Sequence, residues 1–139
     1  MLMDKQSLRD KAKSIRTSLT SSEIHKYSEL ITSNVIEVLK ANTSTSIHVY
    51  VSRKSEPRTV ELIQWLMANN YAVYVPMLNG KDMYCKKASD ETIQHILNNP
   101  IAQNDSTACE HMASLDVVIV PTLCFDSAGN RLGYGKGCL

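Results

Sequence analysis

The last residues of the sequence have types and a spacing that suit the binding of an anion. Glycines occupy alternate positions there, and alternating glycines let the backbone approach a ligand and point amide N–H groups at it. Arg131 and Lys136 add positive charge beside those amides, which favours a phosphate group. We therefore predict a phosphate cradle made of Arg131, Leu132, Gly133, Tyr134, Gly135, Lys136 and Gly137.

The glycine spacing in this run matches neither of two common nucleotide-binding patterns. It lacks the four-residue spacer of a Walker A loop, and it lacks the third glycine and following helix of the dinucleotide pattern. A flexible turn is therefore a competing interpretation. The run follows a strongly apolar segment, residues 115–120, by one loop, and this position favours the phosphate cradle. Residues 126–130 are typical of a turn, which is either structural or presents Arg131 to a phosphate.

Basic residues near the start of the sequence form a second candidate group. A stripe at spacings of three and four residues marks one face of an expected helix: Lys5, Arg9, Lys13 and Arg16. Such a stripe is usually a solvated face. Lys5 and Arg9 lie one helical turn apart, so both can also reach one polyphosphate.

Glu56 is a carboxylate at the end of an expected strand, directly before Pro57. One interpretation is that it stabilises the dipole of the helix that follows. The other is that it accepts hydrogen bonds from donor groups of a ligand, such as the N–H groups of a pterin-like ring. The histidines are scattered, and we expect surface or internally satisfied side chains at His25, His48, His95 and His111.

Periodicity and turn residues predict the elements that position these groups. Helices are expected at residues 5–18, 21–40, 59–69 and 90–97, and strands at residues 47–51, 71–76, 82–86 and 115–120. The last strand is a continuous apolar run, which predicts burial on both faces. Residues 101–114 show no clear period and are expected to form a surface loop.

Local signals sharpen several boundaries. Thr20 and Glu23 form a capping box for the second helix. Pro57 is expected where the third helix begins, and Asn79-Gly80 is expected to be a hairpin turn. The second helix should present a mostly apolar face made of Ile24, Tyr27, Leu30, Ile31, Asn34, Val35, Val38 and Leu39.

Strands that alternate with helices indicate an α/β fold with a mainly parallel sheet. Ligands in such folds bind beyond the carboxyl ends of the strands. Three segments of this sequence follow expected strands in that way: residues 52–56, 77–79 and 122–137.

Composition limits the function classes. The 139 residues suit one domain, and a net charge of +1 argues against nucleic acid and acidic membranes as partners. No apolar run approaches the length of a membrane span, and the first residues turn polar at once. The four cysteines show no zinc-ligand spacing, so we expect free thiols in a reducing compartment. We expect a monomer in the cytoplasm, with mitochondria as the alternative.

Together these pieces resemble the 5-formyltetrahydrofolate cyclo-ligase family, also called methenyltetrahydrofolate synthetases, over nearly the whole chain. The weaker pieces are Lys5-x-x-Leu8-Arg9, Arg16-x-x-Leu19-Thr20-x-x-Glu23, Tyr50-Val51-Ser52, Glu56-x-x-Thr59 and Val73-Tyr74-Val75-Pro76. The most specific are Leu115-Asp116-Val117-Val118-Ile119-Val120-Pro121, Phe125-Asp126 and Gly129-Asn130-Arg131-Leu132-Gly133-x-Gly135-Lys136-Gly137.

The resemblance implies a three-layer α/β/α domain over residues 1–139 and an ATP-dependent closure of 5-formyltetrahydrofolate into 5,10-methenyltetrahydrofolate, with ATP and Mg²⁺ as cofactors. It implies that Lys5 and Arg9 hold ATP phosphates. Arg131 and Lys136, with the amides of residues 133–137, would cradle the transferring phosphoryl group and act catalytically. Glu56 would accept hydrogen bonds from the pterin, and Val51, Met83 and Tyr134 would also contact the substrate.

The sequence departs from the family at its end and at one further position. Cys138 and Leu139 stand where the family has two tyrosines, and the aspartate that serves the metal has no counterpart, so the metal ligands stay unknown. We therefore expect the domain to lack the C-terminal part of the family fold. Arg58 also replaces a usually acidic residue. The alternative function is a truncated, non-catalytic homologue that binds folate or nucleotide.

Overall fold

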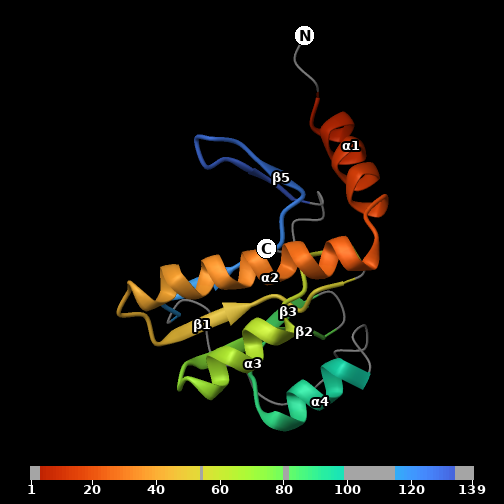
Figure 1. Cartoon of the computed structure of the whole chain (residues 1–139). Helices are drawn as coiled ribbons and strands as arrows, with labels where there is room; N and C mark the ends of the chain where they lie inside the picture. The colour runs from red at the N-terminus through yellow and green to blue at the C-terminus, as the bar shows by residue number, and fades with distance from the viewer. Residues whose placement is uncertain (1–3, 54, 80–81, 99–114, 134–139) are drawn as a thin grey trace.

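The computed structural model describes residues 4–53, 55–79, 82–98 and 115–133. Its helices are α1 (Lys5–Thr17), α2 (Ser21–Lys40), α3 (Val60–Ala68) and α4 (Asp90–Asn98). Its strands are β1 (Ser46–Val49), β2 (Ala72–Asn79), β3 (Asp82–Lys87), β4 (Val117–Ile119), β5 (Cys124–Phe125) and β6 (Arg131–Leu132) (Figure 1). The expected loop at residues 101–114 lies outside the described residues.

The main sheet has the strand order β3-β2-β1-β4. β1 is parallel to both of its neighbours, with Ile47 opposite Val73 on β2 and Val117 on β4. β3 is antiparallel to β2, with Asn79 opposite Asp82 across the expected hairpin. The predicted α/β fold with a mainly parallel sheet is confirmed.

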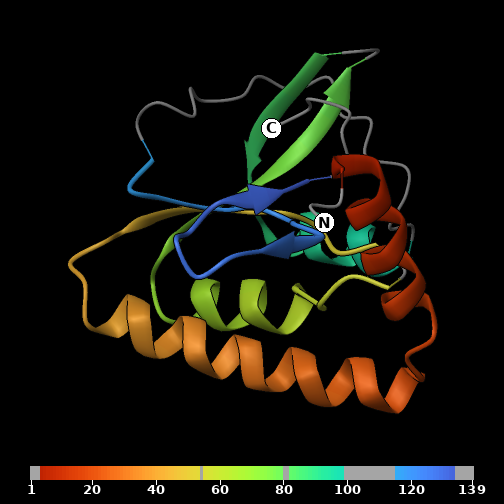
Figure 2. The same cartoon turned by 90° about the horizontal axis from the view of Figure 1, so that it is seen from above.

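The core lies between this sheet and helices α2 and α3, which lie on the same side of it (Figure 2). Alternate residues of β1 and β2 point into the core because side chains alternate along a strand. Ile47 and Val75 are fully buried there, beside Ile63 and Leu66 of α3 and the nearly buried Leu39 of α2. This packing supports the carboxyl ends of β1 and β4, where the candidate site lies.

The helix starts follow from local hydrogen bonds. The Thr20 hydroxyl accepts a hydrogen bond from the Glu23 amide, and the Glu23 carboxylate accepts one from the Thr20 amide, each at 3.1 Å. The predicted capping box of α2 is therefore confirmed. Asp4 caps α1 by accepting a hydrogen bond from the Ser7 amide at 2.7 Å, and this bond lowers the pKa of the Asp4 carboxyl.

Two boundaries differ from the prediction. α3 begins at Val60, one residue after the expected start at residue 59 but three after Pro57, because Pro57 and Thr59 are held beside the end of β1 by hydrogen bonds. β2 continues to Asn79, because its antiparallel pairing with β3 extends it. Residues 77–79 therefore lie within a hairpin and do not form the predicted ligand-binding loop.

One prediction of burial was wrong. β4 is not buried on both faces: it forms one end of the described sheet, and the Val118 side chain is 41% exposed. The predicted apolar face of α2 is only partly turned toward the core. The helix turns Leu39 and Ser28 inward and leaves Tyr27, Leu30, Ile31 and Val38 largely exposed. Among the described residues, no helix has the length and apolar character needed to cross a bilayer.

Candidate functional site

The candidate site lies beyond the carboxyl ends of β1 and β4. Because these strands are parallel neighbours, the segments that follow them leave the sheet side by side. We call residues 50–53 and 55–59, after β1, the Glu56 loop. The segment after β4 leads into a two-stranded hairpin, β5–β6, which ends beside Gly133. The sequence predicts candidate ligands in both segments.

The Glu56 loop is held to the end of β1 by Thr59, whose side chain is 3% exposed. The Thr59 hydroxyl donates to the Tyr50 carbonyl at 2.8 Å and accepts from the Ser52 amide at 3.0 Å. The Thr59 amide donates to the Ser52 hydroxyl at 3.2 Å, and the Tyr50 hydroxyl donates to the Pro57 carbonyl at 3.2 Å. These bonds satisfy backbone groups that would otherwise be buried without partners.

Glu56 lies within this network and is only 7% exposed. Its amide donates to the Arg53 carbonyl at 3.0 Å and closes a turn. The intervening Ser55 has a φ of +82°, a conformation that glycine adopts most easily. Val51, the predicted apolar wall of the substrate site, is 8% exposed and packs in the core cluster.

The β5–β6 hairpin confirms the predicted turn at residues 126–130. The Asp126 carboxylate accepts hydrogen bonds from the Asn130 side chain and amide, each at 2.9 Å, and from the Ala128 amide at 3.0 Å. The bonds from Asn130 are the main reason why the pKa of Asp126 lies below its ordinary value. Gly129 has a φ of +87°, which this turn requires. The turn therefore has a structural role and brings Arg131 back along β6.

Two guanidinium groups meet at Gly133. The Arg9 Nε atom of α1 donates to the Gly133 carbonyl at 3.0 Å. The Nη1 atom of Arg131 lies 3.4 Å from the position that a Cβ atom would occupy on Gly133. Arg9 and Gly133 are 124 residues apart in the sequence, so the fold brings together two candidate phosphate ligands from opposite ends of the chain.

The other predicted ligands are placed as follows. Lys5 is exposed in the first turn of α1. Leu132 is half-buried, and its carbonyl accepts a hydrogen bond from the Leu123 amide at 2.9 Å. Met83 lies in β3 opposite Leu78, and its side chain is outside the described part of the structure. Tyr134, Gly135, Lys136 and Gly137 lie outside the described residues.

Sequence reasoning missed the role of Arg16. The sequence shows it as one member of a basic stripe, whereas its Nε atom donates to the Ser55 carbonyl in the Glu56 loop at 3.0 Å. Its two terminal nitrogens are buried. The available signal was its spacing from Arg9: seven residues, or two helical turns, place both on one face. α1 thus contacts both segments of the candidate site, and Figures 1 and 2 show it outside the helix–sheet body, beside the hairpin.

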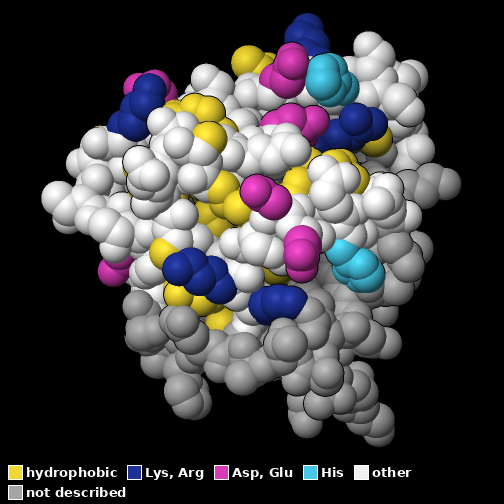
Figure 3. Space-filling model, turned by 90° about the horizontal axis from the view of Figure 1, so that it is seen from below, with side chains coloured by type: hydrophobic (Ala, Val, Ile, Leu, Met, Phe, Trp, Pro, Cys, Tyr) yellow, Lys and Arg dark blue, Asp and Glu magenta, His cyan; other side chains and the backbone are white. Residues whose placement is uncertain are grey.

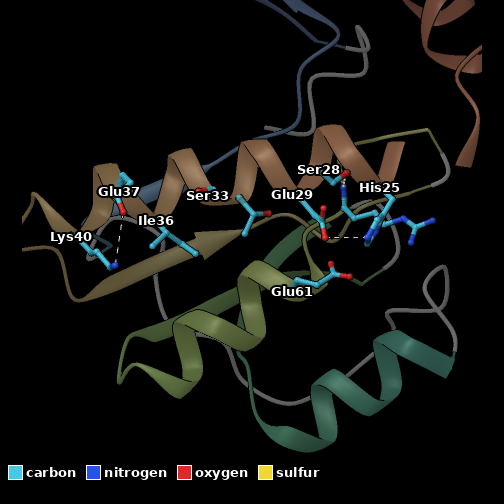
Figure 4. A pocket seen from close by; sticks show the side chains of 10 residues that line it. His25, Ser28, Glu29, Ser33, Ile36, Glu37, Lys40 and Glu61 are labelled. Atoms are coloured by element: carbon cyan, nitrogen blue, oxygen red, sulfur yellow. Dashed lines mark hydrogen bonds and ion pairs between the residues drawn. The ribbon is translucent and has the colours of Figure 1, made fainter. Parts of the chain in front are cut away.

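A separate hollow of about 420 Å³ lies between α2 and the start of α3. Glu61 projects into it from α3, and two side-chain pairs of α2 line it: His25–Glu29, with a nitrogen–oxygen distance of 3.1 Å, and the ion pair Glu37–Lys40 at 3.9 Å (Figure 4). None of Arg9, Arg131 and Glu56 lines it, so it does not coincide with the candidate site. Figure 3 shows acidic, basic and histidine side chains interspersed on the face seen from below.

The sequence matches one family model over residues 2–138, that of the 5-formyltetrahydrofolate cyclo-ligase family. The chain belongs to this family. It is 27% identical over 142 residues to the 5-formyltetrahydrofolate cyclo-ligase of Haemophilus influenzae, a match that covers 96% of this chain and 74% of that protein. The mouse protein of the same name is also 27% identical, with 96% of this chain and 70% of that protein covered.

Two solved structures share the fold. A 5,10-methenyltetrahydrofolate synthetase from Mycoplasma pneumoniae has a TM-score of 0.74 at 20% identity, over 97% of this chain and 74% of that chain. The NMR structure of the synthetase from Aquifex aeolicus has a TM-score of 0.76 at 22% identity, over 98% of this chain and 70% of that chain. At these identities the likeness concerns the fold alone.

Proposed function

We propose that this chain catalyses the ATP-dependent cyclisation of 5-formyltetrahydrofolate to 5,10-methenyltetrahydrofolate, with release of ADP and phosphate. The observation that carries the proposal is the meeting of Arg9 and Arg131 at Gly133 in a member of this family. A bound polyphosphate would neutralise both guanidinium groups, which lie beside the same backbone position.

The ATP end of the proposed site comprises α1 and the end of the hairpin. Arg9 uses one of its five N–H donors in the hydrogen bond to the Gly133 carbonyl, and the other donors could bind phosphate oxygens. Arg131 would contact the transferring phosphoryl group, and Lys5 would add a point charge one turn before Arg9. The proposal also assigns the amides of residues 133–137 and Lys136 to this cradle, on the sequence pattern alone.

The folate end comprises the Glu56 loop. Glu56 would accept hydrogen bonds from the pterin, and its buried surroundings would strengthen them. Val51, Met83 and Tyr134 complete this end of the proposal. Because the Glu56 loop and the segment leading to Gly133 follow neighbouring parallel strands, the two substrates would meet beyond their carboxyl ends.

The proposed chemistry needs positioning and charge neutralisation more than a protein nucleophile. The formyl oxygen attacks the γ-phosphorus while the bond from that phosphorus to the ADP oxygen breaks. N10 then attacks the activated formyl carbon and loses its proton. The ring closes when N10 bonds to that carbon, and the bond from the carbon to the phosphate oxygen then breaks, which releases phosphate. Arg9 and Arg131 would stabilise the negative charge on the phosphoryl group.

Magnesium is part of the proposal only as a companion of ATP. In the described ranges, no group of three or more His, Cys, Asp or Glu side chains is arranged to hold a metal ion. A site that holds the ion with protein side chains alone is therefore not part of the proposal. We propose that the ion arrives with ATP, bound by phosphate and water oxygens, as Mg²⁺ commonly is. None of the steps above is assigned to it.

We also propose that the protein acts as a monomer on small molecules in a reducing compartment such as the cytoplasm. Cys85 and Cys124 support this compartment, because neither forms a disulfide within the described residues and Cys85 is buried.

Turnover of 5-formyltetrahydrofolate, followed by the absorbance of the methenyl product, tests the proposal. We expect product only with ATP and Mg²⁺, and a loss of rate in Arg131→Gln that the exposed-helix control Lys11→Gln does not show. Turnover without ATP would contradict the mechanism. Calorimetry that finds folate affinity without any turnover would favour the alternative, a non-catalytic binding module.

A further inference from the structure

The guanidinium group of Arg16 holds one end of a single peptide bond in the Glu56 loop. Its Nε atom donates to the Ser55 carbonyl, which belongs to the peptide bond between Ser55 and Glu56. The amide of the same peptide bond donates to the Arg53 carbonyl at 3.0 Å. This peptide plane is therefore held through both its oxygen and its nitrogen.

The restrained peptide bond follows a strained residue. Ser55 has a φ of +82°, and residues other than glycine adopt this left-handed region only at a cost in conformational energy. Such a conformation persists where surrounding contacts determine it. The hydrogen bond from Arg16 is one such contact, and it is charge-assisted and part-buried, which makes it stronger than a neutral one.

The restraint acts on the peptide plane that directly precedes the Glu56 side chain. The Ser55–Glu56 peptide plane sets the direction in which the Glu56 backbone leaves the turn, and the Glu56 side chain is 7% exposed. If the turn relaxed to a negative φ at Ser55, that plane would rotate and the carboxylate would move with it.

We propose that Arg16 is a positioning residue, which holds Ser55 in its left-handed conformation and thereby aims Glu56 at the folate end of the site. The role at the folate end rests on the function proposed above, whereas the restraint of the turn does not. Because Arg9 of the same helix bonds to Gly133, α1 also sets the distance between the two ends of the site.

Steady-state kinetics of Arg16→Gln test the role of the turn in folate binding. The loss of one charge-assisted hydrogen bond should raise the KM for 5-formyltetrahydrofolate about 10- to 100-fold. The KM for ATP should change less than about twofold, since Arg9 keeps its bond to Gly133. Lys11→Gln removes an exposed charge from the same helix and should leave both constants unchanged.

Two variants of Ser55 separate the restraint from simple damage to the fold. Ser55→Gly in the Arg16→Gln background should recover most of the lost folate affinity, because glycine adopts positive φ without restraint. Ser55→Val with Arg16 intact should raise the KM for folate, because a β-branched residue resists that conformation. Failure of both variants to behave in this way would overturn the proposal.

Hydrogen exchange of the Glu56 amide, measured by NMR on the unliganded protein, tests the restraint independently of activity. We expect the Glu56 amide to exchange faster in Arg16→Gln than in the unaltered protein. In the double variant with Ser55→Gly it should exchange more slowly than in Arg16→Gln alone. An unchanged Glu56 amide, or equal rises of both KM values, would overturn the positioning role. Absence of turnover in the unaltered protein would instead overturn the proposed function, and hydrogen exchange would then decide the restraint alone.

Discussion

The two segments that form the candidate site are stabilised in different ways. The Glu56 loop is buried: Thr59 is 3% exposed, and its hydrogen bonds close the loop onto the end of β1. The β5–β6 hairpin is exposed, and Phe125 has 79% of its surface in solvent. Its turn is closed by local bonds around Asp126, and a single bond from Arg9 reaches Gly133 from α1.

The Glu56 loop is thus held by its contacts with the core, whereas the hairpin is held mainly by hydrogen bonds within its own turn. Buried, hydrogen-bonded loops keep one conformation because any change leaves polar groups without partners. Exposed hairpins open at a lower free energy than the core. Under the function proposed above, we expect the folate end to be formed in the absence of ligand, and the β5–β6 hairpin to open less often when ATP neutralises Arg9 and Arg131.

The largest effect is expected from breaking the Glu56 loop. Thr59→Val keeps the shape of the side chain but leaves the Tyr50 carbonyl and the Ser52 amide without their partner. The free energy of unfolding should fall by about 3 kcal/mol, the cost of two buried groups left unsatisfied. Urea denaturation measures it. Thr43→Val, at an exposed position, is the matched control and should change it little. A small change at Thr59 would mean that the loop is not held as described.

Removing Arg9 tests the exposed segment. Arg9→Gln should lower kcat/KM for ATP about 30-fold, which corresponds to about 2 kcal/mol of lost transition-state stabilisation. The free energy of unfolding should change by less than about 0.5 kcal/mol, because α1 has no fully buried residue. Steady-state kinetics and denaturation on one preparation check both values. A large loss of stability with little loss of activity would mean that Arg9 stabilises the fold rather than binding phosphate.

His48 tests the buried side of the comparison through pH. It is 1% exposed, and within the described structure its ring nitrogens have no hydrogen-bond partner. Burial lowers its pKa below the ordinary value. Near pH 6.5 the His48 ring therefore binds a proton in the unfolded chain but not in the folded one. The contribution of neutral His48 to the free energy of unfolding is complete above that pH and declines below it.

The free energy of unfolding should fall by up to about 1.4 kcal/mol per pH unit while the pH is lowered from the ordinary pKa of histidine to the lowered pKa of His48. Urea midpoints at pH 7.5, 6.5 and 5.5, as chosen conditions near that pKa, measure it. His48→Leu should remove most of the slope, whereas His25→Gln, at an exposed position, should keep it. An equal slope in the unaltered protein and in His48→Leu would assign the effect to other groups.

The smallest effect is expected in the hairpin turn. Gly129→Ala places a side chain at a φ of +87°, which costs about 1 kcal/mol although no atom lies within 4 Å of the new Cβ. Because the hairpin is exposed, the loss should appear as faster hydrogen exchange in β5 and β6 rather than as a lower unfolding midpoint. Gly133→Ala lacks the positive φ and should leave that exchange unchanged. A shift of the midpoint in Gly129→Ala would show that the hairpin unfolds with the core.

Much of the fold was predictable from local patterns. The capping box at Thr20, the alternating apolar residues of β1 and β2, and the turn residues around Asp126 each act within a few positions of the chain. The α/β class follows from the order of such elements. Burial of whole faces was less predictable, because Val118 and the outer residues of α2 have apolar side chains whose exposure depends on what packs beside them.

The candidate site was also predictable only in part from the sequence. The residue types in the last loop and at Glu56 indicate phosphate and ligand binding by themselves, and the helical spacing of Lys5 and Arg9 adds a second phosphate-binding group. The contacts were not predictable. No periodicity shows that Arg9 reaches Gly133, that Arg16 holds the peptide bond before Glu56, or that Val51 packs in the core.

The sequence by itself determined the class of fold, the local turns and caps, and the family to which the chain belongs, because these depend on residue types at short spacing. Only the tertiary structure decided which arginine meets which carbonyl. Such contacts join residues 39 and 124 positions apart, and their geometry is set by the packing of the sheet and helices between them.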